Sequence, residues 1–323
     1  MEFNKKELAQ KVSLLYYENN KSQNEIATEL EISRSYVSQL LSFARKSGIV
    51  EIIVHVDEFG LRMIREEVRF KTRFPGLKQV YIMKSQSEGF TELNLGKFSV
   101  PYIADMINDA EVIGVNLGQA VENTIDQLQR QSFADTSNKQ VVQIMGGFSN
   151  SAIRAVQPNE VVRKLGTILN CDSYYLNCPA VVEQPQLRKA LLREKSIETI
   201  ANMWNHIDLA IMGIGVADGR SKLFNTLTPE MSEVVERSNA YAELTINFFD
   251  KEGKHIHLLE DNKISIPFRQ LKKIKRKVVI CYGEYKKKAI AAALKAGMID
   301  VLITDSITIN AVENYIDGKH TTP

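Results

Sequence analysis

SQNEIATELEISRSYVSQLLSFARKSG, residues 22–48, decides how the first part of the chain folds. Ser22 and Glu25 stand three residues apart, the capping-box spacing in which each side chain accepts a hydrogen bond from a free backbone N–H at a helix start. A helix is therefore predicted to begin near Gln23. Its inner face is apolar at helical spacing, with Ile26, Ala27 and Leu30.

A second helix is predicted after a turn at Glu31 and Ile32. Ser33 is a residue type preferred at helix N-caps. The apolar stripe of this helix has helical spacing and consists of Val37, Leu40, Leu41 and Ala44. Turns of this kind often carry glycine where this chain has Glu31, so we expect either an unfavourable backbone conformation there or a differently shaped turn. Two short helices joined in this way have the layout of a helix-turn-helix.

The outer face of the second helix is polar, and its side chains are of the kinds that donate to phosphates and read base edges in a major groove. The predicted DNA-contacting residues are Ser33, Arg34, Ser35, Tyr36, Ser38, Gln39, Arg45 and Lys46. Amphipathic helix pairs also occur in many α-rich proteins, so a purely structural or protein-interaction role for the first 55 residues is the alternative.

The charge of this region is concentrated, not large. Residues 1–55 carry seven Lys or Arg and seven Glu, but between residues 32 and 50 every charged side chain is positive. Few phosphate contacts per subunit are therefore available, and pairing of subunits on a two-fold operator becomes a requirement of the DNA-binding interpretation.

Apolar residues on either side of the motif complete the predicted N-terminal organisation. Leu8, Val12, Leu15 and Tyr16 repeat at helical spacing before it and predict a first helix. Residues 49–56, IVEIIVHV, predict a short strand or wing. A linking helix follows over residues 61–74, with Leu61, Ile64 and Val68 on its apolar face and charged residues facing away. The predicted divisions are 1–55 for the helix-turn-helix domain, 56–76 for the linking helix and 77–323 for a larger domain.

Composition indicates an ordinary globular chain. It has 323 residues, 44% hydrophobic and 25% charged, with a net charge of +2. The start has no continuous apolar segment of the signal-peptide kind, and no uncharged apolar run approaches the roughly 20 residues of a membrane span. We therefore expect a cytoplasmic protein that contacts no membrane.

Cysteine and histidine usage predicts neither disulfides nor a metal site. The three cysteines, Cys171, Cys178 and Cys281, are odd in number and lack metal-ligand spacing. The five histidines are scattered. His255 and His257 stand two apart, as on one face of a strand, and a surface strand or a ligand pair would each produce that spacing.

From Gln79 onward, short apolar runs alternate with helical segments. Such alternation predicts an α/β domain with a mostly parallel, Rossmann-like sheet covered by helices, and ligands of such sheets bind beyond the carboxyl ends of the strands. The predicted strands are QVYIM (79–83), EVIGV (111–115), QVVQIM (140–145), LAIMGI (209–214), KVVICY (277–282) and DVLIT (300–304).

Several of these strands end in glycine, which lets the backbone approach a ligand closely, while a following helix start offers amide donors to an anion. A single glycine after a strand is typical of a turn, but four such loops in one sheet favour a phosphate-bearing small molecule. One loop carries Lys286 three residues after Gly283. Neither GxxxxGK[ST] nor GxGxxG occurs, so a nucleotide-binding motif is not indicated. No catalytic set can be assigned to specific loops, and Asp250 has two interpretations, a turn residue or a ligand for sugar hydroxyls.

The order of motifs resembles the SorC/DeoR-type sugar-binding transcriptional regulators. The likeness covers nearly the whole chain: the helix-turn-helix stretch, then IGVNLG, QIMGG, IMGIG, NFFDKEG, YGEYKKKAIAAAL and DVLITD. The resemblance implies a DNA-binding domain joined to an effector domain similar in fold to sugar-phosphate isomerases and deaminases but used for sensing. It also implies dimers or tetramers on DNA that are released or remodelled by a phosphorylated sugar.

The resemblance also implies which residues bind the effector. Carried over by position, they are Gly118, Gln119, Gly146, Gly147, Gly213, Gly215, Asp250, Gly283 and Lys286. The chain departs from the family pattern at Gln119-Ala120, at Met145, where a basic residue is frequent, at Tyr282, and at residues 239–243, NAYAE. These departures leave fewer phosphate donors, so the ligand is expected to be differently placed, less charged, or bound mainly through Lys286 and backbone amides. Met145 also removes an amine that could form a covalent adduct with an aldehyde sugar.

The predicted function is a DNA-binding regulator, a repressor of a carbohydrate or polyol catabolic operon, that is not an enzyme and needs no cofactor. Its predicted partners are operator DNA, a phosphorylated sugar or polyol, and further copies of the chain in a homodimer or homotetramer. The alternative is an isomerase- or deaminase-like enzyme with a fused helical domain.

Overall fold

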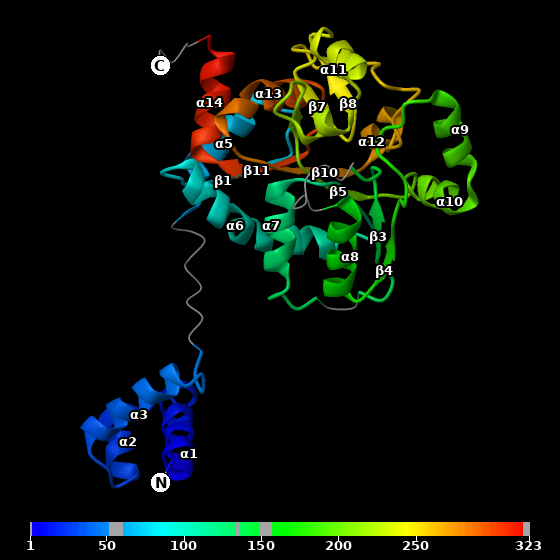
Figure 1. The fold of residues 1–323 in the computed structure, drawn as a ribbon. Coiled ribbons are helices and arrows are strands. Elements are labelled where there is room, and N and C mark those ends of the chain that lie inside the picture. The colour runs from blue at the N-terminus through cyan, green and yellow to red at the C-terminus, as the bar shows by residue number, and fades with distance from the viewer. Residues whose placement is uncertain (1, 52–60, 134–135, 149–156, 319–323) are drawn as a thin grey trace. The chain divides into compact units, whose positions relative to one another are not determined.

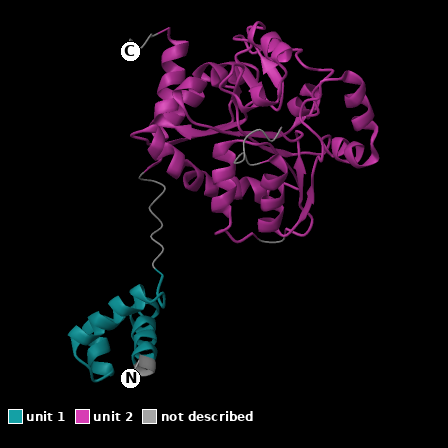
Figure 2. Ribbon diagram, viewed as in Figure 1, with its two compact units in different colours: residues 1–58 teal, residues 59–323 magenta. Residues whose placement is uncertain are grey.

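The computed structural model describes residues 2–51, 61–133, 136–148 and 157–318. The chain divides into two compact units, residues 1–58 and residues 59–323 (Figure 2).

The first unit is helical. Its elements are α1 (Glu2–Ser13), the π-helical turn η1 (Leu14–Glu18), α2 (Gln23–Glu29) and α3 (Arg34–Lys46). The predicted capping box is confirmed: the Glu25 N–H donates to Ser22 Oγ at 3.3 Å, and the Ser22 N–H donates to Glu25 Oε2 at 2.8 Å. Ser33 caps α3 by accepting from the Tyr36 N–H at 3.2 Å. Glu31 has a φ of +52°, the unfavourable conformation that its place in the turn predicts.

The core of this unit consists of the predicted apolar stripes. Val37, Leu40, Leu41 and Ala44 of α3 are buried with Ile26 of α2 and Val12 of α1. Most of the strand or wing predicted over residues 49–56 lies outside the described residues, and Ile49 and Val50 are not in a strand.

The predicted linking helix is α5 (Ile64–Arg73), part of the second unit, and the face that it buries is not its predicted apolar face. Ile64 is 51% exposed and Val68 is 63% exposed, whereas Glu67 and Phe70 are buried. Glu67 turns inward because its carboxylate accepts from the Ile82 N–H at 3.0 Å and pairs with Arg62 at 2.8 Å. A buried carboxylate with these partners is satisfied, so the helix can present an apolar stripe to solvent.

A seven-stranded parallel sheet forms the centre of the second unit (Figure 1). Its strand order is β1-β11-β10-β5-β2-β3-β4. The strands are β1 (Gln79–Met83), β2 (Val112–Val115), β3 (Gln140–Gln143), β4 (Asp172–Tyr174), β5 (Leu209–Met212), β10 (Arg276–Ile280) and β11 (Val301–Asp305). All six predicted strands are present. The seventh, β4, is a short edge strand without the buried apolar run that marks the others.

Helices cover both faces of this sheet, as predicted for an α/β fold. Alternate residues of β1 point to opposite faces: Val80 and Ile82 join one core with α13 and α14, while Met83 joins the other with α6, α7 and α8. The helices are α6 (Glu88–Asn108), α7 (Gln119–Leu128), α8 (Pro158–Leu169), α9 (Pro185–Arg193), α10 (Lys195–Met203), α11 (Pro229–Glu236), α12 (Phe268–Lys273), α13 (Lys287–Lys295) and α14 (Ser306–Ile316), with the 3₁₀ turns η2 (Lys222–Thr226) and η3 (Glu284–Lys286).

A second, antiparallel sheet was not predicted. It consists of β6 (Gly215–Val216), β7 (Ala242–Leu244), β8 (Asn247–Phe249) and β9 (His255–Ile256), in that order. These strands have two or three residues each, too few for an alternating pattern to be seen. Thr245 and Ile246 connect β7 to β8 with φ values of +53° and +59°, which are strained for β-branched side chains.

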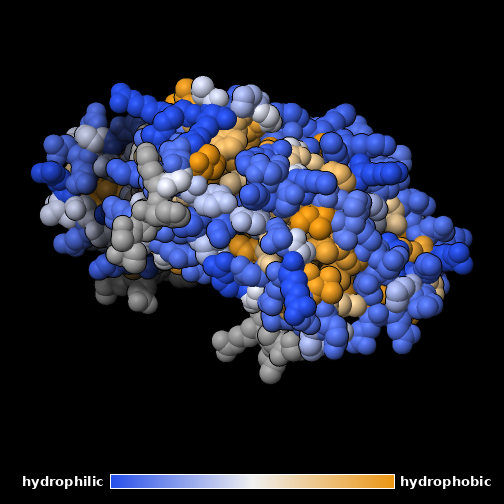
Figure 3. Space-filling view, turned by 90° about the horizontal axis from the view of Figure 1, so that it is seen from above, coloured by the Kyte–Doolittle hydropathy of each residue, from blue (hydrophilic) through white to orange (hydrophobic). Residues whose placement is uncertain are grey.

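Polar and charged side chains dominate the face of the molecule drawn in Figure 3, with small apolar patches between them. Among the helices of the described ranges, none combines the length and the apolar character that a membrane crossing requires.

Candidate functional site

The polar face of α3 is accessible. Seven of the eight predicted DNA-contacting residues are exposed, and only Tyr36 is half-buried, where it packs against the core of the first unit. The Ser33 hydroxyl is partly committed, because it accepts from the Tyr36 N–H and lies 3.0 Å from Ser35 Oγ. The helix therefore presents Arg34, Ser38 and Gln39 at its start and Arg45 and Lys46 at its end.

A cavity of about 280 Å³ lies at the carboxyl edge of the parallel sheet. From β2 the chain proceeds to β3 and β4 on one side, and from β5 it proceeds to β10 and β11 on the other. The neighbouring strands β2 and β5 thus form the point where the strand order reverses, which is where such sheets bind ligands. The loops that follow these two strands, residues 116–120 and 213–216, line the cavity.

Glycine allows these loops to meet. A Cβ on Gly118 would lie 3.2 Å from Gly213 Cα, and a Cβ on Gly213 would lie 3.2 Å from the Leu117 carbonyl oxygen. A Cβ on Gly215 would lie only 2.4 Å from Glu243 Oε2. Side chains at these positions would push the loops apart or displace Glu243.

The amino end of α7 opens into the cavity. Gly118 is the N-cap and supplies no side-chain acceptor, so backbone N–H groups of the first turn lack a capping partner from that residue. Gln119 and Ala120 line the cavity beside it. Uncapped N–H groups and the helix dipole together favour an anion at this position.

Lys286 and Glu243 bring opposite charges to the cavity wall. Burial lowers the pKa of Lys286, an effect opposed by Cys281, Glu243 and Glu88. Burial raises the pKa of the Glu243 carboxyl, although its carboxylate accepts from the Ile246 N–H and is near Lys263 and Lys286. A cation and a hydrogen-bonding carboxyl in one enclosed space suit a ligand that carries an anion and hydroxyl groups.

Some lining residues were missed by the sequence analysis. They are Glu88 and Glu92 of α6, Arg220, Ser221 and Lys222 after β6, and Glu243 of β7 as a lining residue. Arg220 is held by Asp218, with N–O distances of 2.9 and 2.6 Å, and its guanidinium carbon lies 5.4 Å from the centre of the Tyr285 ring. The signal that could have found this loop is Arg220-Ser221-Lys222, which comes a few residues after Gly213 and Gly215, the glycines that follow β5. No sequence signal places α6 beside the cavity.

Tyr282 and Tyr285 form an aromatic part of the wall. Burial raises the pKa of Tyr282 to about 12, so its hydroxyl is a neutral donor at physiological pH. Gly283 between them has a φ of +108° and donates its N–H to Thr308 Oγ1 at 2.8 Å. The glycine conformation thus places both rings without lining the cavity itself.

Five of the nine predicted effector residues line the cavity: Gly118, Gln119, Gly213, Gly215 and Lys286. Gly146 and Gly147 instead serve packing, since a Cβ on Gly146 would lie 2.5 Å from the Pro179 carbonyl oxygen and the Gly147 N–H donates to the Cys178 carbonyl at 2.9 Å. Asp250 lies in a turn, where its Oδ1 accepts from the N–H groups of Glu252 and Lys254 at 2.9 Å each. Of its two interpretations, the geometry matches the turn residue.

Two families match this chain by sequence. Residues 61–313 match a family described as "putative sugar-binding domain", and residues 7–47 match sigma-70, region 4. The first match includes the parallel sheet and every residue that lines the cavity, and the second includes α2 and α3.

Relatives of similar length are transcriptional regulators by name. The deoxyribonucleoside regulator of Bacillus subtilis is 25% identical over 322 residues, covering 97% of this chain and 99% of that protein. The sorbitol operon regulator of Klebsiella pneumoniae is 26% identical over 308 residues, covering 92% and 95%. The crystal structure of full-length SorC, the sorbitol operon regulator of Klebsiella pneumoniae, superposes with a TM-score of 0.80 at 26% identity, covering 95% of this chain and 98% of that structure.

Proposed function

This chain belongs to the family of SorC-type sugar-binding transcriptional regulators, and we propose that it represses a carbohydrate or polyol operon in the cytoplasm until a phosphorylated sugar binds its larger unit. The observation that carries the ligand proposal is the cavity at the reversal of strand order, which both the uncapped start of α7 and the Lys286 side chain line.

The two ends of the cavity suit the two parts of such a ligand. A phosphoryl group would accept hydrogen bonds from the backbone N–H groups of α7 and from Lys286. Sugar hydroxyls would donate to Glu243 and exchange hydrogen bonds with Gln119 and Ser221, all of which line the cavity. The volume lies near the lower limit of about 300 Å³ for small-molecule sites, which favours a small sugar phosphate over a nucleotide.

Other cations in the cavity wall compensate for the basic residue that the family pattern has at position 145. Met145 lines the cavity where relatives frequently carry a basic residue, but Arg220 and Lys222 line it as well. We infer that these two cations contribute part of the positive field that the missing basic residue would supply.

We further propose that the exposed stripe of α5, Ile64 and Val68, is where copies of the chain associate. The helix is anchored to its own unit through Arg69 and Glu313, which are 2.5 Å apart, so its outer face is held in place for a partner. Val68→Glu should then yield smaller particles by light scattering, while Leu187→Glu, at an exposed apolar residue of α9, should not. Equal particle mass for Val68→Glu and the unchanged protein would remove α5 from the interface.

The proposed ligand class is tested by thermal shift of the full chain against matched pairs of free and phosphorylated sugars and polyols. A sensor raises its melting temperature with a phosphorylated member of a pair and leaves that compound unconsumed. Turnover of the compound would instead support the isomerase- or deaminase-like alternative. A response to free sugars alone would contradict the phosphate part of the proposal.

A further inference from the structure

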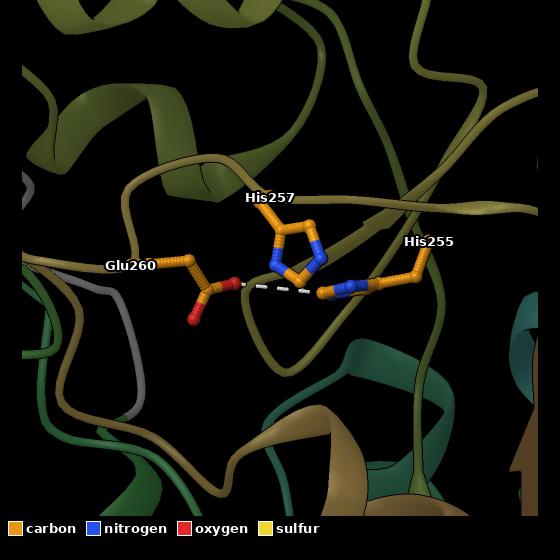
Figure 4. Close-up of side chains that lie close together, drawn as sticks. All are labelled: His255, His257 and Glu260. Atoms are coloured by element: carbon orange, nitrogen blue, oxygen red, sulfur yellow. Dashed lines mark ion pairs between the residues drawn. The ribbon is translucent and has the colours of Figure 1, made fainter.

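Three potential metal ligands converge at the edge of the antiparallel sheet. His255 lies in β9, His257 follows it, and Glu260 lies in the next turn (Figure 4). One ligand atom from each side chain lies within 4.8 Å of the other two. His255 Nε2 and Glu260 Oε1 are 3.8 Å apart, which is too far for a hydrogen bond.

His255 is the unexplained member of this cluster. Its side chain is only 7% exposed, and neither ring nitrogen has a hydrogen-bond partner among the described residues. The ring is fixed by stacking on Phe268, with centroids 4.2 Å apart and planes 5° apart. An imidazole has one donor and one acceptor or two donors, so burying both nitrogens without partners is unfavourable. A bound ion is one of the few arrangements that accounts for such a group.

The other two ligands leave a path from solvent to His255. His257 is exposed, and the Glu260 side chain is 39% exposed. Lys263 Nζ donates to Glu260 Oε1 at 2.8 Å, but a carboxylate has a second oxygen. Lys263 also donates to the Ile246 carbonyl at 3.0 Å and to Asn247 Oδ1 at 2.9 Å, so it keeps partners if Glu260 rotates towards an ion.

We propose that His255, His257 and Glu260 bind a Zn²⁺ ion, with water or a small exogenous ligand in the fourth position. Two imidazoles and one carboxylate are a donor set that Zn²⁺ takes, with bonds of about 2.0–2.2 Å that place neighbouring ligand atoms roughly 3.3 Å apart. The His255–Glu260 distance of 3.8 Å therefore closes by about 0.5 Å, which small side-chain rotations supply.

The proposal departs from the sequence-based prediction of no metal site. The spacing His-x-His-x-x-Glu predicts that the two histidines lie on one face of a strand. It does not predict that the chain turns back between His257 and Glu260. Leu259, with a φ of +56°, makes that turn and returns Glu260 to the histidines. None of the three residues lines the cavity at the carboxyl edge of the parallel sheet. The ion would therefore stabilise the antiparallel sheet and take no part in binding the proposed sugar.

The test is a titration of the chelator-treated full chain with Zn²⁺ alone, followed by Co²⁺ as a spectroscopic probe. The expected result is one ion per chain and the visible absorption of a tetrahedral Co²⁺ site. His257→Ala and Glu260→Gln each remove a ligand at the accessible side of the site, and each should weaken Zn²⁺ binding by at least about tenfold, because loss of an outer partner alone costs about 10–100-fold. His206→Ala, at an exposed histidine elsewhere, is the matched control and should bind as the unchanged chain does.

Two results would overturn the proposal. The first is the absence of stoichiometric Zn²⁺ binding by the unchanged chain. The second is a Zn²⁺ affinity that neither His257→Ala nor Glu260→Gln alters, since the ion would then be held by other residues. Circular dichroism of both variants checks that each is folded. Neither His257 nor Glu260 is buried, so we expect both variants to fold.

Discussion

The two sheets of the larger unit differ in how they are built and in what they contribute. Strands of the parallel sheet such as β5 and β11 are completely buried runs of four and five residues. The glycine loops of the cavity follow β2 and β5, and the loop after β2 leads into the start of α7. The antiparallel sheet has strands of two or three residues, a strained connection at Thr245 and Ile246, and the cluster around His255. The comparison indicates that the parallel sheet positions the loops of the cavity, while the smaller sheet adds Gly215 and Glu243 to the cavity wall.

The largest expected effect concerns stability. Ile303 is fully buried in β11, between β1 and β10 of the parallel sheet, whereas Ile256 of β9 is only partly buried. Ile303→Ala should lower the free energy of unfolding by about 2–5 kcal/mol, and Ile256→Ala by roughly half as much, because it removes less apolar area from burial. Denaturant unfolding of both variants measures this difference. Equal losses would mean that the small sheet is as well packed as the large one.

The next largest expected effect is on the binding of the ligand's phosphoryl group. Lys286 follows the parallel strand β10 and lines the cavity, so Lys286→Gln removes a charge-assisted hydrogen bond to a phosphoryl group. Loss of about 1.5–3 kcal/mol is expected, for the phosphorylated sugar and for inorganic phosphate alike. Calorimetric titration checks it, with Lys288→Gln, an exposed neighbour that does not line this cavity, as the control. Unchanged phosphate affinity in Lys286→Gln would place the phosphoryl group elsewhere.

A substitution in the antiparallel sheet, at Glu243, should have a smaller effect on ligand affinity, and only for the phosphorylated sugar. Glu243→Gln keeps an acceptor for the Ile246 N–H but removes the carboxylate that would accept from the hydroxyls of the proposed sugar. Binding of the phosphorylated sugar should weaken by about 0.5–1.5 kcal/mol. Inorganic phosphate should bind as before or more tightly, because a negative neighbour is gone. If both ligands weakened equally, Glu243 would be a structural support rather than a contact for hydroxyls.

The smallest effect is a pH dependence. Burial lowers the pKa of Lys286, so this amine loses its proton at a lower pH than an exposed lysine does. Affinity for the phosphorylated sugar should therefore be highest below that pKa and fall as the pH rises through it, and an anion bound beside Lys286 should raise its pKa. Calorimetry near the lowered pKa in buffers of different ionisation enthalpy should show proton uptake on binding. Uptake that persists unchanged in Lys286→Gln would assign the proton to another group.

The same contrast explains what the sequence could predict. Largely apolar runs four or five residues long, such as those of β5 and β11, can be recognised because every residue is buried. Glycines that follow β2 and β5 within a few residues mark the loops at residues 118, 213 and 215. The capping box at Ser22 and Glu25 is equally local, because both hydrogen bonds form within four residues.

The features that the sequence did not predict depend on contacts between residues far apart in the chain. Glu67 is buried because a backbone N–H fifteen residues away needs an acceptor, and so the apolar stripe of α5 faces solvent. Gly146 resembles a ligand-loop glycine but is required by the Pro179 backbone. Glu88 and Glu92 come to the cavity from α6, far from any glycine strand end. In each case the partner is distant in sequence and no local pattern encodes it.

Control of DNA binding by the ligand is the central claim, and it is tested most directly by titrating the full chain against the DNA upstream of its own gene, with and without the phosphorylated sugar that raises its melting temperature. We predict binding that weakens steeply with salt, is weakened by about 1–3 kcal/mol in Arg34→Ala, and changes when the sugar is added. An effector can shift this equilibrium only if it binds the two states differently. DNA affinity that is identical with and without the sugar, or absent even at low salt, would contradict the claim.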